Sequence, residues 1–180
     1  MSPEIQTSSG SWYNFQEPEK VDIEIVDIAA ALSRICRFNG QLRDEIDIYT
    51  VAQHSVECSY LVPDEYAFQA LMHDAHEAYV GDVTSPFKQL LNDYKHYEKL
   101  AEAAVHKRFG LPMQLHPCVK EADMIMLATE QRDFQLNPDP GLEGIQPLAR
   151  KLSAWSVRKS KQAFIERFIY LTGRHRAAAA

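Results

Sequence analysis

Residues 97–110, YEKLAEAAVHKRFG, carry the clearest fold signal in the chain. Apolar side chains recur there every three or four residues, at Tyr97, Leu100, Ala101, Ala104, Val105 and Phe109. At 3.6 residues per turn these side chains share one helix face. Gly110 follows directly and supplies a helix stop. The segment therefore predicts an amphipathic helix that packs its apolar face against other elements.

The same periodicity extends in both directions from this segment. Downstream it predicts helices over 117–134 and from the cap residue Ser156 to Leu171. Upstream it predicts helices over 87–91, 64–80, 50–61 and 24–36, the third of these opening with a Thr50–Gln53 capping box. No stretch of four to eight residues alternates as a strand does. We therefore expect an all-α, compact helical bundle of about six to eight helices.

The domain organisation follows from where this periodicity is lost. Residues 1–20 are polar and turn-rich, so we expect an N-terminal arm or lid, with Trp12 and Tyr13 as its aromatic anchors. Residues 21–172 form the predicted domain, because a chain of 180 residues suits a single core. Residues 173–180 are expected to be a disordered tail.

Charge and cysteine usage narrow the class of protein. The chain has 19 Lys and Arg against 25 Asp and Glu, a formal charge of −6. Nucleic-acid binding needs clustered cations, so we expect no nucleic-acid partner. Three separated cysteines and the lack of an apolar leader or span predict a cytoplasmic protein with reduced thiols and no membrane partner.

His73-Asp74 is the feature that bears on chemistry. On its own a His-Asp pair on a helix is more often a solvated pair than a ligand pair. Here it follows the apolar run Ala70, Leu71 and Met72, where a buried charge is costly unless paired or coordinated. Candidate partners lie on other predicted helices at His54 and Asp123. Two imidazoles and two carboxylates suit Mn, Co, Fe, Ni or Zn with positions left open for water and substrate.

Other nucleotide and metal motifs fail. A zinc-protease HExxH would need Glu at position 74 and His at position 77, where the chain has Asp74 and Glu77. Neither a GxxxxGK[ST] phosphate loop nor a GxGxxG dinucleotide loop is present.

Three segments resemble the HD-domain metal-dependent phosphohydrolases. They are residues 50–55 (TVAQHS), residues 73–82 (HDAHEAYVGD) and residues 36–40 (CRFNG). His54, His73-Asp74 and Asp123 follow one another in an order that resembles the family's H…HD…D pattern. The resemblance covers about residues 7–172 and extends to 5'-deoxynucleotidases and to phage dATP triphosphohydrolases.

This resemblance implies roles for specific residues. At least one divalent metal per chain, a transition metal or Mg, would be held by His54, His73, Asp74 and Asp123. Glu77 would orient or deprotonate the attacking water. Asp82 would assist proton transfer or phosphate positioning, unless it only forms a turn after Gly81.

The resemblance also implies substrate contacts. Arg37 would clamp a phosphate and Lys88 would add a second cation. The alternative for each is a surface cation with no part in binding. Phe38 stands where related deoxynucleotidases have Trp, which leaves sugar selectivity open. His76 replaces a small residue, and a solvated histidine is favoured over a phosphate contact or an extra metal ligand.

The resulting hypothesis is a nucleotide phosphohydrolase. Lys88 and His76 favour a deoxynucleoside triphosphate, split into nucleoside and tripolyphosphate, over a deoxynucleoside monophosphate. A non-catalytic nucleotide-binding module and a purely structural bundle are the alternatives. The first would be expected to lack some of these residues, and the second leaves the inward His and Asp unexplained. Apolar residues on the last helix predict a homo-oligomer.

Overall fold

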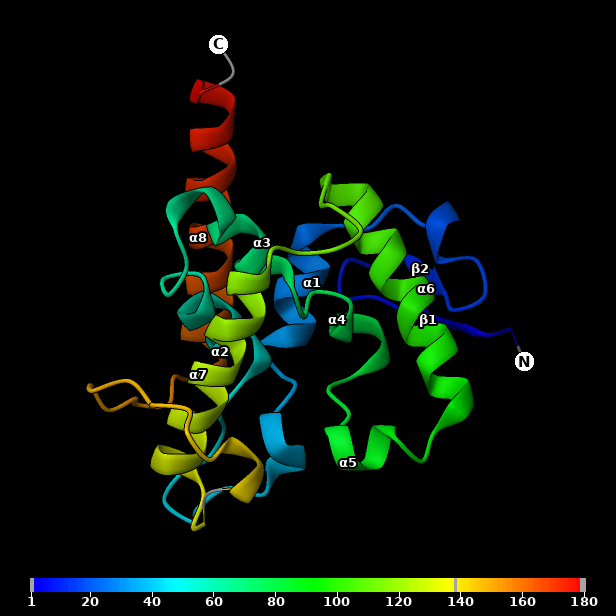
Figure 1. The fold of residues 1–180 in the computed structure, drawn as a ribbon. Coiled ribbons are helices and arrows are strands. Elements are labelled where there is room, and N and C mark those ends of the chain that lie inside the picture. The colour runs from blue at the N-terminus through cyan, green and yellow to red at the C-terminus, as the bar shows by residue number, and fades with distance from the viewer. Residues whose placement is uncertain (1, 138, 179–180) are drawn as a thin grey trace.

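The computed structural model describes residues 2–137 and 139–178, with side chains described up to Gly173. Its α-helices pack together as Figure 1 shows: α1 Ile25–Leu32, α2 Val51–Cys58, α3 Ala67–Met72, α4 Glu77–Val80, α5 Ser85–Lys88, α6 Asn92–Phe109, α7 Pro117–Phe134 and α8 Val157–Ala178. Short 3-10 turns add η1 Pro18–Lys20, η2 Arg37–Gly40, η3 Asp64–Tyr66 and η4 Pro140–Leu142. The compact helical fold expected from the sequence is confirmed.

The expectation that the chain has no strands is wrong near the N-terminus. Strands β1 Glu4–Gln6 and β2 Trp12–Asn14 form a small antiparallel hairpin in which Ile5 faces Tyr13. Three-residue strands are too short to show alternation, which explains why the pattern missed them. Tyr13 is fully buried and its ring stacks on that of Tyr79 in α4, whereas Trp12 is exposed. One of the two expected aromatic anchors therefore packs into the core.

Helix α2 is the centre of the fold, because all eight of its residues are buried. Its start is set by Thr50, whose hydroxyl accepts a hydrogen bond from the Gln53 amide at 3.1 Å, as the capping pattern predicts. Apolar residues of α1, α2, α3, α6 and α8 form one core cluster. A second cluster joins α2 and α3 to α7. The polar side chains of α2 lie between these clusters, where apolar packing excludes water.

The expected helix over 64–80 is broken at His73-Asp74. Between α3 and α4 the backbone tightens into three-residue turns, with the Ala75 amide donating to Met72 and the Glu77 amide to Asp74, both at 3.0 Å. The His73 ring also donates from Nδ1 to the Ala70 carbonyl at 2.7 Å. His73 itself keeps helical backbone angles, with φ −59° and ψ −36°, so the change of geometry between α3 and α4 lies in the turns that follow it.

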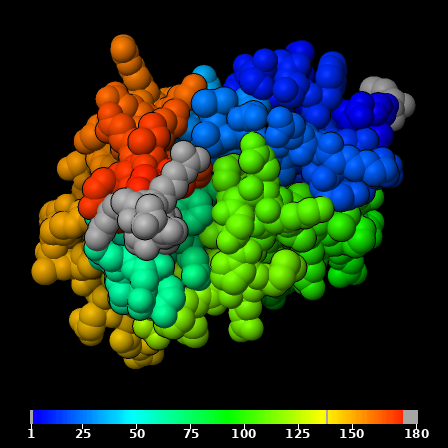
Figure 2. All heavy atoms as spheres, turned by 90° about the horizontal axis from the view of Figure 1, so that it is seen from above, coloured from blue at the N-terminus to red at the C-terminus, as the bar shows by residue number. Residues whose placement is uncertain are grey.

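The C-terminal half of the chain follows the predicted pattern more closely. Gly110 ends α6 with a φ of 67°, the left-handed conformation that glycine adopts without strain. The backbone of α8 is helical to Ala178, beyond the expected end at Leu171 and into the segment expected to be a disordered tail, whose residues 179 and 180 lie outside the described part. In Figure 2 the N-terminal segment and the C-terminal helix lie on different sides of the molecule, with the middle of the chain beside them. In the described residues, no helix has the length and apolar content needed to cross a membrane.

Candidate metal centre

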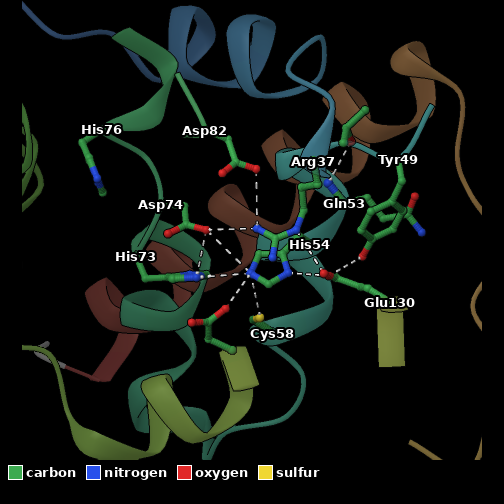
Figure 3. Close-up of polar contacts among 12 residues, drawn as sticks. Arg37, Tyr49, Gln53, His54, Cys58, His73, Asp74, His76, Asp82 and Glu130 are labelled. Carbon is green, nitrogen blue, oxygen red and sulfur yellow. Dashed lines mark hydrogen bonds and ion pairs between the residues drawn. The ribbon is translucent and has the colours of Figure 1, made fainter. Parts of the chain in front are cut away.

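His54 lies at the middle of a convergent cluster of side chains (Figure 3). Its Nε2 atom is 3.3 Å from Nε2 of His73, 3.3 Å from a carboxylate oxygen of Asp123 and 3.6 Å from one of Asp74. His73 Nε2 is in turn 3.1 Å from the Asp74 carboxylate. The structure thus brings together, from α2, the α3–α4 break and α7, the four residues expected as metal ligands.

Both imidazoles are held by their far nitrogen. His54 Nδ1 lies 2.5 Å from Glu130, and His73 Nδ1 lies 2.7 Å from the Ala70 carbonyl. When one ring nitrogen donates its proton to an oxygen, the other is presented as the ligand atom. Both Nε2 atoms therefore face the same space. Among the described residues, His54, Cys58 and His73 form a group that could hold a metal ion.

Glu130 of α7 connects the imidazole of His54 to two further residues. Its buried carboxylate accepts from Nδ1 of His54, from the Tyr49 hydroxyl at 2.9 Å and from Arg37 Nε at 3.0 Å. Burial alone would raise the pKa of Glu130, but Arg37 and His54 lower it, so the group stays ionised. Glu130 therefore orients a histidine and an arginine at once.

The cluster is rich in negative charge. Arg37 approaches Asp74 at 3.8 Å and Asp82 at 4.0 Å, in addition to Glu130. Burial disfavours charge on Arg37, yet these acids raise its pKa. One guanidinium faces several carboxylates: Asp74, Asp82, Asp123, Glu77 and Glu130. The acids also raise the pKa of His54 and of His73 despite their burial, so protonated imidazoles can help to balance these carboxylates when no metal is bound, and a metal ion would take over that role.

Glu77 shows the cost of burying these acids most directly. Its side chain is buried, and one carboxylate oxygen, Oε2, has no hydrogen-bond partner among the described residues. Burial raises the pKa of Glu77 well above its ordinary value, and Asp74 and Asp82 raise it further. The metal-free fold therefore favours the protonated carboxyl, and a cation bound nearby would lower this pKa and make Glu77 able to accept a proton from water.

Two hollows open on this cluster and share Asp74, Glu77, Lys88, Lys120 and Asp123 in their walls. One has a volume of about 460 Å³ and adds Arg37, Asp82 and the apolar side chains of Phe38, Met124, Leu127 and Leu142. The other, of about 540 Å³, adds His76, Glu98 and His116. A larger hollow of about 640 Å³ lies along the C-terminal part of α7 and includes none of the four expected ligands.

Phe38 is held in an unusual backbone conformation beside this site. Phe38 and Asn39 both have positive φ, 57° and 51°, which non-glycine residues adopt at a cost of about 1 kcal/mol or more. The guanidinium of Arg37 lies 5.5 Å from the centre of the Phe38 ring. The turn thereby presents a cation and an aromatic ring to the same hollow.

Two of the expected substrate contacts, Lys88 and His76, lie near Glu98 and not among the side chains around His54. Lys88 lines both hollows, but its ammonium is paired with Glu98. His76 lies apart from the His54 cluster in Figure 3, with Nε2 3.9 Å from Glu98. The solvated His76 favoured from the sequence is wrong, because its side chain is buried by packing in the α3–α4 turn.

Three residues at the centre were missed from the sequence. Glu130 lies seven residues after Asp123, two turns along the same face of α7, and Cys58 lies four residues after His54 on α2. Tyr49 carries no comparable spacing signal. Helical spacing from the named ligands would have found the first two.

Comparison with known proteins adds relatives. The chain is 51% identical over 144 residues to the uncharacterised Escherichia coli K12 protein YfdR, covering 78% of this chain and 79% of YfdR. The chain belongs to the YfdR family. Another relative of this YfdR-family chain, the uncharacterised Rhodobacter capsulatus protein RCAP_rcc00048, is 36% identical over 122 residues, or 63% of the chain and 62% of that protein. No protein-family model matches. Neither relative's name states an activity.

Proposed function

We propose that the chain is a divalent-metal-dependent hydrolase of deoxynucleotide phosphates, similar to the HD-domain phosphohydrolases. The observation that carries the proposal is the convergence of His73, Asp74 and Asp123 on Nε2 of His54. Two imidazoles and two carboxylates are a donor set for a transition metal with open positions.

The residues present fit a cation. Burial would raise the pKa of Asp74 and of Asp123, but the neighbouring histidines lower both, so the carboxylates are ionised and available as ligands. A divalent cation held there would polarise a phosphoryl oxygen and acidify a water. The negative excess of the cluster, with the unpartnered oxygen of Glu77, supports this fit independently of the resemblance.

The protein's own groups would carry the remaining steps. Glu77 would take the proton of the attacking water, because a cation bound beside it would lower its raised pKa and keep the carboxylate ionised. Arg37 would hold the phosphoryl group as negative charge builds on it, and Glu130 keeps that guanidinium in place. Phe38 with Met124 and Leu127 offers an apolar wall for the nucleoside.

A deoxynucleoside triphosphate, hydrolysed at its first phosphorus to nucleoside and tripolyphosphate, remains the proposed substrate. Lys120 lines both hollows as a further cation, although its ammonium is paired with the Asp123 carboxylate at 2.7 Å. Pairing of Lys88 with Glu98 weakens the triphosphate proposal, because one expected phosphate cation is already neutralised. A 5'-deoxynucleotidase acting on monophosphates is therefore the second candidate.

The test is product analysis with a panel of nucleotides. Metal-stripped protein receives dATP, ATP, dAMP or AMP with Mn²⁺, Co²⁺, Zn²⁺ or Mg²⁺, and products are separated by chromatography. We expect deoxyadenosine and tripolyphosphate from dATP, only with metal, and a loss on the order of 100-fold or more in Glu77→Gln. Release of phosphate from dAMP alone would establish the nucleotidase instead. Nucleotide binding without turnover by any of the four would contradict both.

A further inference from the structure

Cys58 points at the candidate metal centre from the interior of the protein. It lies one turn after His54 on α2, so both side chains project from the same helix face. Its sulfur is fully buried and lies 3.5 Å from Nε2 of His54, the same nitrogen that faces His73 and Asp123 (Figure 3).

The distances suit a shared ion. The ligand atoms of His54, Cys58 and His73 all lie within 4.8 Å of one another. Zinc bonds to nitrogen and sulfur are about 2.0 and 2.3 Å long, so neighbouring donors on one ion are roughly 3–3.7 Å apart. The sulfur of Cys58 thus needs little or no movement to join the donors of His54.

An ordinary buried cysteine would pack as a small apolar side chain. Cys58 does contact an apolar cluster that includes Ala70, Val119 and Met126. Its sulfur is nevertheless placed against an imidazole nitrogen surrounded by carboxylates. Helical spacing places the two side chains next to each other, and the contact with Nε2 gives the sulfur a polar neighbour beside its apolar ones.

We propose that Cys58 binds the metal as a thiolate and gives the centre a mixed nitrogen, oxygen and sulfur donor set. The inference rests on the metal centre of the proposed function and adds a ligand to it. A thiolate favours Zn²⁺, Co²⁺ or Fe²⁺ over Mg²⁺ and Mn²⁺, so the residue selects the metal.

The test is the absorption spectrum of the Co²⁺-loaded protein. A thiolate bound to Co²⁺ adds a sulfur-to-metal charge-transfer band in the near ultraviolet, beside the weak visible bands that any bound Co²⁺ gives. We expect this band in the unmodified protein and its loss in Cys58→Ser. Cys118→Ser is the matched control. Cys118 is partly exposed and its sulfur lies 3.1 Å from Nδ1 of His116, so this pair could also offer Co²⁺ a sulfur and an imidazole nitrogen.

A second measurement compares the affinity of the protein for Zn²⁺ and for Mn²⁺ in competition experiments. Cys58→Ser should lose Zn²⁺ affinity on the order of tenfold or more, and clearly less Mn²⁺ affinity. Equal losses for both metals would overturn the selective role of the thiolate.

The possible outcomes distinguish a failure of Cys58 as a ligand from a failure of the metal centre itself. Visible Co²⁺ bands without the near-ultraviolet band, in the unmodified protein, would overturn Cys58 as a ligand and leave the metal centre standing. A near-ultraviolet band lost in Cys118→Ser and kept in Cys58→Ser would overturn it too. Failure to bind Co²⁺ at all would overturn both proposals. The spectrum of the unmodified protein decides the first case even if Cys58→Ser does not fold.

Discussion

At the scale of single residues, Glu130 connects the two halves of the candidate site. The same buried carboxylate holds Nδ1 of His54 and Nε of Arg37, so the orientation of an expected metal ligand and of an expected phosphate contact depends on one side chain. Carboxylates behind metal-binding histidines typically contribute 10–100-fold to metal affinity.

Glu130→Gln tests this role with little change in shape. The amide keeps the size of the side chain but can no longer accept equally from His54, Tyr49 and Arg37. We expect metal affinity to fall roughly 10–100-fold, measured by calorimetric titration with Mn²⁺ or Zn²⁺. Glu121→Gln, an exposed position on the same helix, should bind metal as the unmodified protein does. Equal affinity in both variants would show that Glu130 positions nothing.

Glu77→Gln should separate function from stability. Because the pKa of Glu77 is raised in the fold, its protonated form is favoured there, and the associated stability is present at low pH and lost as pH rises through the raised pKa. Glutamine mimics the neutral form at every pH. The metal-free variant should therefore melt above the unmodified protein at pH 8, by roughly 2–4 °C for each kcal/mol relieved, and the gap should close on acidification. A metal-free variant that melts lower at pH 8 would refute this sign.

The inner site was largely foreseeable residue by residue, because His54, His73, Asp74 and Asp123 carry ligand-type side chains in an order that resembles a known family. The outer residues were less so. Whether Lys88 is free depends on Glu98, which reaches it from another helix, and no spacing rule gives that pairing. The burial of His76 likewise arises from tertiary packing.

At the scale of elements, periodicity found the helices and missed their interruptions. Residues 97–109 lie in α6, but the helix begins earlier, at Asn92. The predicted helix over 64–80 is interrupted where the His73 ring bonds the Ala70 carbonyl. Such local side-chain bonds compete with helix geometry without altering the apolar pattern. The break coincides with the expected ligands His73 and Asp74.

The N-terminal hairpin is a second element that periodicity did not predict, and its packing can be measured. Tyr13 is fully buried and stacks on Tyr79 with ring centres 3.8 Å apart. Tyr13→Ala should lower the free energy of unfolding by about 3–5 kcal/mol in denaturant titrations, the usual cost of removing a large buried aromatic ring.

Two variants bracket this prediction. Tyr13→Phe keeps the ring and removes a buried hydroxyl that has no partner among the described residues, so it should be neutral or stabilising. Trp12→Ala, on the same strand but exposed, should change stability by about 0.5 kcal/mol or less. If Tyr13→Ala costs no more than Trp12→Ala, the hairpin is a loose arm and not part of the core.

At the scale of the whole molecule, the fold places polar chemistry between two apolar clusters. Helix α2 contributes to both clusters, carries the buried His54, and places Cys58 in the second cluster. Helix α7 brings Asp123 and Glu130 to the same place from a distant part of the sequence. The helical class followed from composition and spacing. The meeting of α2 with α7 depends on packing that no local pattern contains.

The central claim is that this centre hydrolyses a nucleotide phosphate only when it holds a metal. The most direct measurement titrates metal-stripped protein with Co²⁺ while following dATP hydrolysis, with Asp74→Asn as the paired variant. We expect no turnover without metal, a rate that saturates at about one equivalent of metal per chain, and no comparable rise in the rate of Asp74→Asn. Turnover that survives complete metal removal, or that rises equally in Asp74→Asn, would contradict it.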